Sequence, residues 1–241
     1  HFSAVLRYQP DSPEAYNNLG LAAARQGYVD KAIDYYFTAV RLKPDYPQAH
    51  NNLGNALASQ GKLDQAIRHY SEALRIKPED AEAHSNLANV LASQGRFKEA
   101  IDHYSQALQI KPDNFEAHNN LGVVLADQGK FNEAIDHYSE ALRIRPDYAK
   151  AHHDLAVVLE KQGRMEEAID HYYEALRIEP NNTIAHIQLA LLWRSQERTD
   201  KAIEHYQKAL SLSPDSTLVL NNLAWILATH ENSRFRDGAG P

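Results

Sequence analysis

Seven prolines follow one another along the chain at a constant spacing of 34 residues. They are Pro10, Pro44, Pro78, Pro112, Pro146, Pro180 and Pro214. A repeat of this length holds two short helices with their turns, and it is too small to bury its own apolar face. Such repeats become stable only by stacking on one another. The period therefore predicts an all-α solenoid, whose function we expect to lie in a groove rather than in a catalytic pocket.

Six full repeats fit between Pro13 and Ser216 without gaps. They span residues 13–46, 47–80, 81–114, 115–148, 149–182 and 183–216. Residues 1–12 match the second half of a repeat, and residues 217–241 match a first half followed by a tail. We expect all of these to form one continuous solenoid domain. Because both ends are half repeats, we also expect the chain to be a piece of a longer protein.

Within the repeat 47–80, two apolar stripes at helical spacing are separated by Gly61 and closed by Pro78. The first stripe contains Leu53 and Leu57, and the second contains Tyr70. The eighth place of each repeat, counted from Pro13 as the first place, is always small: Gly20, Gly54, Ala88, Gly122, Ala156 and Ala190. Small side chains there let the two helices of a pair approach to about 8–10 Å.

These positions carry a resemblance to a known family. Tyr or His at the fourth place, Leu-Gly at the seventh and eighth, Ala at the twentieth and twenty-seventh, Tyr at the twenty-fourth and Pro at the thirty-second resemble the tetratricopeptide repeat. The resemblance covers residues 13–216 as whole repeats. It implies a right-handed α-solenoid of stacked antiparallel helix pairs that binds protein or peptide. It implies little about which partner is bound.

Composition excludes several classes of function. The formal net charge is -7, whereas sequence-independent nucleic-acid binding requires a basic surface. No run of 18 apolar residues is present, so we expect no direct membrane contact. Cysteine is absent, so disulfides and thiolate metal sites are excluded, and the compartment stays open between cytoplasm and periplasm.

The sixth place of each repeat forms a ladder of mostly amide side chains. It holds Asn18, Asn52, Asn86, Asn120, Asp154, Gln188 and Asn222. A carboxamide has both donor and acceptor groups, so it can bind a peptide backbone whatever the side chain. The ladder resembles that of the O-linked N-acetylglucosamine transferase superhelix, where such amides bind substrate backbone; Asp154 and Gln188 depart from it. The alternative is that these amides bond within or between helices.

Flanking places of the first helix in each repeat should line the same groove. The candidates are Asn17, Asn51, Asn55, Asn89, Asn119, His153 and Arg194. Towards the C-terminus the lining becomes apolar, with Ile184, Leu191 and Trp225. Two explanations stay open for this apolar end: a pocket for an apolar ligand, or a surface that a further repeat covers.

The sequence lacks the residues that several kinds of binding or catalytic site require. The fifth place carries no Lys or Arg, so the carboxylate clamp of chaperone-binding tetratricopeptide modules is missing. Most of the thirteen histidines fall at two repeat places, and they lack metal-ligand spacing, so we interpret them as neutral packing residues without a metal. No catalytic or phosphate-binding motif is present. We therefore expect a protein that is not an enzyme and takes no cofactor.

We interpret the chain as a scaffold that binds an extended peptide or a protein partner along its groove. One alternative is a domain that recruits substrate for a linked glycosyltransferase. Another is head-to-tail self-assembly, in which the half repeats at the two ends of different chains complete each other. The residues expected at those ends are Phe2, Leu6, Leu220, Leu223, Trp225 and Leu227.

Overall fold

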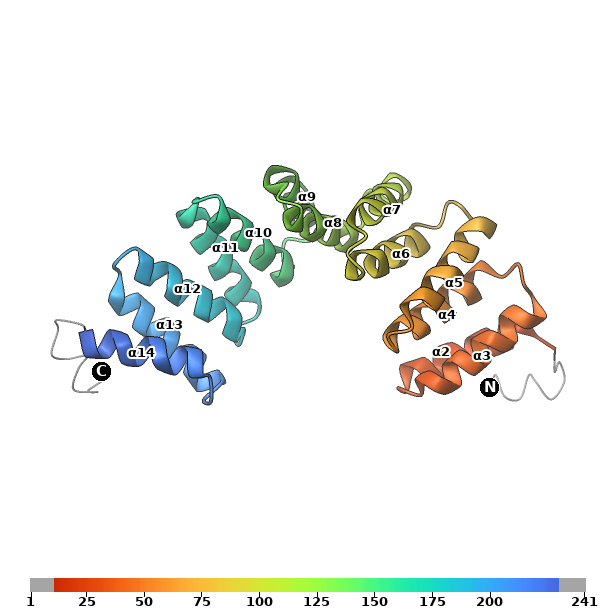
Figure 1. The fold of residues 1–241 in the computed structure, drawn as a ribbon, viewed down its shortest axis with the longest axis horizontal. Helices are drawn as coiled ribbons and strands as arrows, with labels where there is room; N and C mark the ends of the chain where they lie inside the picture. The colour runs from red at the N-terminus through yellow and green to blue at the C-terminus, as the bar shows by residue number, and fades with distance from the viewer. Residues whose placement is uncertain (1–10, 230–241) are drawn as a thin grey trace. The chain divides into compact units, whose positions relative to one another are not determined.

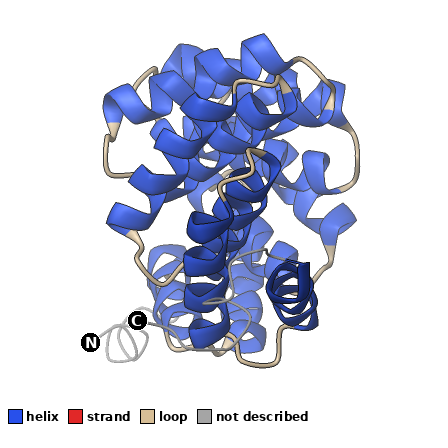
Figure 2. Cartoon of the chain, turned by 90° about the vertical axis from the view of Figure 1, so that its left-hand side faces the viewer, coloured by secondary structure: helices blue, strands red, loops and turns tan. Residues whose placement is uncertain are grey.

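The computed structural model describes residues 11–229, which form helices joined by short turns, with no strand in that range (Figures 1 and 2). In chain order the helices are α2 (Pro13–Arg25), α3 (Val29–Leu42), α4 (Pro47–Ser59), α5 (Leu63–Ile76), α6 (Ala81–Ser93), α7 (Phe97–Ile110), α8 (Phe115–Asp127), α9 (Phe131–Ile144), α10 (Ala149–Lys161), α11 (Met165–Ile178), α12 (Thr183–Ser195), α13 (Thr199–Leu212) and α14 (Thr217–Thr229). Even-numbered helices are the first in each repeat (helix A); from α3 to α13, odd-numbered helices are the second (helix B). None of these described helices is long and apolar enough to cross a membrane.

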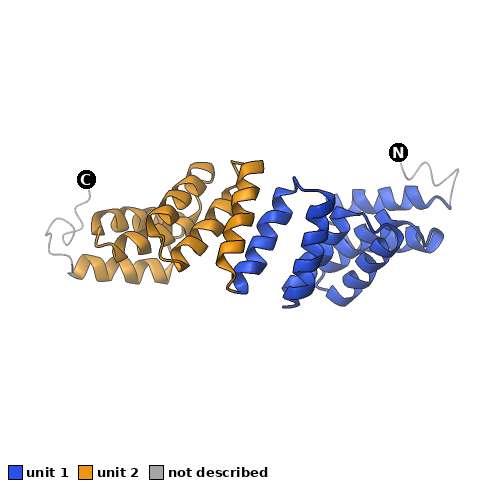
Figure 3. Cartoon of the chain, turned by 90° about the horizontal axis from the view of Figure 1, so that it is seen from above, with its two compact units in different colours: residues 1–128 blue, residues 129–241 orange. Residues whose placement is uncertain are grey.

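The chain divides into two compact units, His1–Gln128 and Gly129–Pro241 (Figure 3). In unit 1 the helices pack as the antiparallel pairs α2–α3, α4–α5 and α6–α7, and α8 packs against α7. In unit 2 the pairs are α10–α11 and α12–α13, with α9 against α10 and α14 against α13. This arrangement confirms the all-α solenoid fold class. A single continuous solenoid domain across both units stays a prediction.

Helix boundaries follow from local chemistry that recurs every repeat. Helix A of repeat 3 begins after Asp80, whose side chain accepts a hydrogen bond from the Ala83 N–H at 3.2 Å and so caps the helix. Helix A of repeat 2 is followed by Gly61 at φ +73, a left-handed conformation that glycine adopts without strain. In repeat 6 the matching residue is Glu197, which adopts φ 59 without being glycine. That conformation costs roughly 1–2 kcal/mol in a residue with a Cβ.

The core is built from one tyrosine of every helix B. Tyr36, Tyr70, Tyr104, Tyr138, Tyr172 and Tyr206 are all at most 2% exposed. The ring of Tyr70 lies against the backbone of Gly54, where a Cβ atom would be 2.6 Å from Cε1 of the ring. The small eighth place therefore makes room for the tyrosine of the same pair. The sequence analysis had instead explained the small eighth-place residue by the close approach of the two helix backbones.

Candidate functional site

The ladder residues lie on successive helices A, and each side chain is partly buried. Unit 1 carries Asn18, Asn52, Asn86 and Asn120 on α2, α4, α6 and α8. Unit 2 carries Asp154, Gln188 and Asn222 on α10, α12 and α14. In unit 1, α2 packs on α4, α4 on α6 and α6 on α8, so the helices that carry these four asparagines follow one another (Figure 1).

In unit 1 the ladder amides connect neighbouring repeats. Asn52 donates from Nδ2 to Oδ1 of Asn17 at 2.9 Å, and Asn86 donates to Oδ1 of Asn51 at 3.1 Å. Among the described residues these are the side-chain hydrogen bonds that Asn52 and Asn86 make. A carboxamide has two N–H donors and an oxygen with two lone pairs. Each of these two amides therefore keeps one N–H and its oxygen for another partner, while the interhelix bond holds its orientation.

The pattern changes at the third repeat, where Ser85 replaces asparagine at the fifth place. Asn120 donates instead to Oδ1 of Asn89, at 3.1 Å. Serine is too short to reach the next helix, so the bond moves one turn along α6. Ser85 Oγ is buried and has no hydrogen-bond partner among the described residues.

Core tyrosines hold the ninth-place amides in position. Tyr70 donates its hydroxyl to Oδ1 of Asn55 at 2.7 Å, and Tyr104 donates to Oδ1 of Asn89 at 2.5 Å. Burial raises the pKa of both tyrosines, so both hydroxyls stay protonated donors at neutral pH. The sequence analysis missed this role. Its signal was present, since Asn at the ninth place and Tyr at the twenty-fourth occur together in repeats 2 and 3.

The ladder positions of unit 2 have different partners. His153 Nδ1 lies 3.4 Å from Oδ1 of Asp154, so a carboxylate replaces the amide there. Asn222 donates from Nδ2 to the Leu218 carbonyl at 2.8 Å and accepts from Nη1 of Arg194. Both ends of the Asn222 amide are thus occupied. Gln188 on α12 makes no side-chain hydrogen bond within residues 11–229, so the amide-to-amide bonds between helices described here belong to unit 1.

The apolar residues predicted near the C-terminus are largely exposed. Leu220 is 44% exposed and Trp225 is 61% exposed, on α14. Leu223 and Leu227 on the same helix are partly buried. Phe2 and Leu6, the other residues of the predicted self-association ends, lie outside the described residues.

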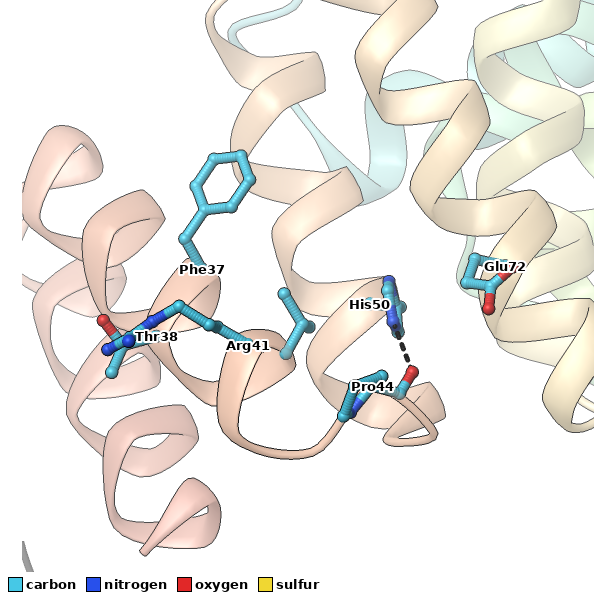
Figure 4. A pocket seen from close by; sticks show the side chains of 7 residues that line it. Phe37, Thr38, Arg41, Pro44, His50 and Glu72 are labelled. Carbon is cyan, nitrogen blue, oxygen red and sulfur yellow. Dashed lines mark hydrogen bonds between the residues drawn. The ribbon is translucent and has the colours of Figure 1, made fainter. Parts of the chain in front are cut away.

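Cavities also occur on the helix B side of unit 1. One of about 380 Å³ lies where α3, α4 and α5 meet, with Phe37 of α3, His50 of α4 and Glu72 of α5 in its lining (Figure 4). A second, of about 420 Å³, occupies the matching place one repeat later and includes His84 and Ile110. Both are mainly apolar, and neither includes a residue of the ladder.

The histidines form pairs between the two helices of a repeat. His50 Nδ1 lies 3.1 Å from His69 Nδ1, and His50 Nε2 lies 3.0 Å from the Pro44 carbonyl oxygen (Figure 4). Equivalent pairs join His84 to His103, His152 to His171 and His186 to His205. Because the proline carbonyl requires a proton on Nε2, the helix A histidine accepts at Nδ1 when it is neutral. Sequence spacing alone did not reveal this pairing.

With this geometry in view, comparison with known proteins assigns the family. A family model described as the C-terminal domain of cilia and flagella-associated protein 70, a tetratricopeptide-repeat model, matches residues 2–186. The chain belongs to this family. The tetratricopeptide repeat model matches residues 183–216, and no curated protein matches the chain.

Solved structures of tetratricopeptide-repeat proteins share this fold. YrrB, described as a TPR protein with an unusual peptide-binding site, has a TM-score of 0.64 and 24% identity, covering 78% of this chain and 96% of that chain. PilF of Pseudomonas aeruginosa has a TM-score of 0.78 and 22% identity, covering 88% of this chain and 97% of that chain. Cut9–Hcn1, an APC/C hetero-tetramer, has a TM-score of 0.75 and 20% identity, covering 91% of this chain and 44% of that chain. At these identities the likeness shows the fold alone.

Proposed function

We propose that this tetratricopeptide-repeat chain binds an extended peptide segment of a protein partner along helices A of unit 1. One observation carries the proposal: Asn52 and Asn86 each use one N–H for an interhelix bond, and the amide has a second N–H and an oxygen. The fold supports a scaffold role, since helix pairs stacked in this way present extended surfaces to partners.

The spacing of the ladder suits an extended strand. Neighbouring helices lie about 8–10 Å apart, and an extended peptide rises about 3.3 Å per residue. Each rung therefore meets about every third residue of the ligand. Recruitment of substrate for a linked glycosyltransferase would use the same amides, so one experiment bears on both functions.

The test is the combined change Asn52→Ala, Asn86→Ala and Asn120→Ala. Each lost hydrogen bond contributes about 0.5–1.5 kcal/mol, so we expect the affinity for a peptide to fall at least about tenfold. The probe is a phage-displayed library of random 12-residue peptides selected on the wild-type chain. Affinities of the selected peptides are then measured by fluorescence anisotropy.

The matched control removes three exposed helix B amides of the same unit, with Gln65→Ala, Gln106→Ala and Gln109→Ala. It should bind the selected peptides as the wild type does. Circular dichroism confirms that each variant keeps its helices. If the ladder variant binds as tightly as the wild type, or if the wild type selects no peptide, the proposal is wrong.

Exposed apolar side chains on α14 favour self-association as a second candidate function. Leu218, Leu220 and Trp225 are 56%, 44% and 61% exposed. We expect the mass measured by sedimentation velocity to rise with concentration in the wild type and to stay monomeric in Leu220→Ser/Trp225→Ser. Ile184→Ser changes an equally exposed residue on α12 and serves as the control. A wild type that is monomeric at the highest concentration would rule this candidate out.

A further inference from the structure

A polar cavity of about 380 Å³ in unit 1 is lined by residues of α6, of α8 and of the turn before α8. Asn86 and Asn120, two successive rungs, both line it. It is therefore placed beside the path proposed for the peptide backbone. The inference below rests on that proposed function and adds a class of side chain to it.

The charge of the cavity is negative. Its lining includes Glu82, Asp113 and Glu116, against the single cation Lys111. None of these four takes part in an ion pair within residues 11–229. Glu82 and Glu116 lie in the first turns of α6 and α8, where the helix dipole favours ionised carboxylates. Asn51 donates to Oε1 of Glu82 at 3.1 Å and orients that carboxylate.

The cavity occurs where the ladder pattern is broken. Ser85 lines it in place of a longer asparagine, and its buried Oγ has no hydrogen-bond partner among the described residues. Buried polar groups are nearly always satisfied by protein, water or ligand. A negatively charged lining, open volume and the unsatisfied hydroxyl of Ser85 therefore occur together in this cavity.

We propose that this cavity binds the cationic side chain of a lysine or arginine in the bound peptide. Glu82 and Glu116 neutralise the cation in the cavity that Ser85 also lines. Asn86 and Asn120 hold the backbone on either side. Charge-assisted hydrogen bonds of this kind are about twice as strong as neutral ones, so the side chain adds selectivity that backbone contacts lack.

The test compares peptide pools selected from the random 12-residue library. The wild type should enrich Arg or Lys at one position, and Glu82→Gln/Glu116→Gln should still select peptides but lose that enrichment. Replacing the enriched residue by Ala should weaken binding about tenfold to the wild type and hardly at all to the double variant. The control, Glu79→Gln/Asp102→Asn, changes net charge equally at exposed residues outside the cavity and should keep the enrichment.

The outcomes separate this inference from the function on which it rests. A wild type that selects peptides without basic enrichment overturns the cationic subsite and leaves peptide binding standing. Enrichment that persists in Glu82→Gln/Glu116→Gln also overturns the subsite. A wild type that selects no peptide overturns both. Circular dichroism verifies folding, because exposed Glu→Gln changes should leave the helices intact.

Discussion

Replacing Gly54 by valine should lower the free energy of unfolding by about 2–3 kcal/mol. A Cβ atom at Gly54 would lie 2.6 Å from Cε1 and 2.8 Å from Cδ1 of Tyr70. The ring cannot easily move, because it is 2% exposed and its hydroxyl bonds Asn55 at 2.7 Å. Valine adds two methyl groups to this clash. It is also β-branched, which lowers helix propensity. The measurement is urea unfolding followed by circular dichroism.

Two variants test whether the clash is the cause. Gly54→Ala adds the same Cβ but gains up to ~1 kcal/mol of helix propensity, so its net change should stay within ~1 kcal/mol. Ala88 shows that the next pair accommodates a methyl at this place. Ala88→Gly should lose about 1 kcal/mol, from propensity alone. If Gly54→Val unfolds at the same urea concentration as Gly54→Ala, the proposed contact with Tyr70 does not limit this site.

The fold was predictable because its determinants are local and repeated. Gly61 and Pro78 end their helices through backbone geometry, which depends on few neighbours. Six copies of the pattern reinforce one another, so an exception such as Glu197 in place of glycine leaves the helix boundary unchanged. The family assignment agrees with the resemblance stated from those residues.

The partners of the site residues were not predictable to the same degree. An amide at the sixth place can bond to the fifth or the ninth place of the preceding repeat, and the choice depends on neighbouring side-chain length. Asn86 bonds to Asn51, while Asn120 bonds to Asn89 because Ser85 is short. Likewise, the constant spacing of His50 and His69 was visible in the sequence. Whether their nitrogens meet depends on ring rotation and tautomer.

The histidine pairs should make the protein lose stability in mild acid. Burial, and then the facing His50, lower the pKa of His69 from 6.5 to about 4. Burial, and then His186, lower the pKa of His205 to about 4. The folded chain thus binds fewer protons than the unfolded chain between pH 6.5 and 4. Its free energy of unfolding should fall across that window, by on the order of 1–2 kcal/mol for each of these two histidines, since solvent screens part of the effect.

Hydrogen bonding in unit 2 explains why neutral His205 is favoured. Trp193 Nε1 donates to the Tyr173 hydroxyl at 3.3 Å, and that hydroxyl lies 3.1 Å from Nε2 of His205. With Trp193 as donor, the hydroxyl proton of Tyr173 points to Nε2, which must then be unprotonated. Nδ1 of His205 donates to His186, which donates in turn to the Pro180 carbonyl. A proton added at Nε2 would face the hydroxyl proton and break this chain of bonds.

Repeat 1 offers the variant that tests this prediction, because Tyr16 and Tyr35 occupy the places of the histidine pair. His50→Tyr/His69→Tyr should reduce the loss of stability between pH 6.5 and 4.5, and the cavity beside His50 leaves room for the larger ring. Urea unfolding at several pH values measures the effect, and NMR titration of the histidine ring protons measures each pKa directly. Asp45→Asn is the control: it changes an exposed carboxylate that is not among the charges shifting the pKa of His69 or His205. Buried histidines that titrate near 6.5, or a stability that is constant from pH 7 to 4.5, would contradict the prediction.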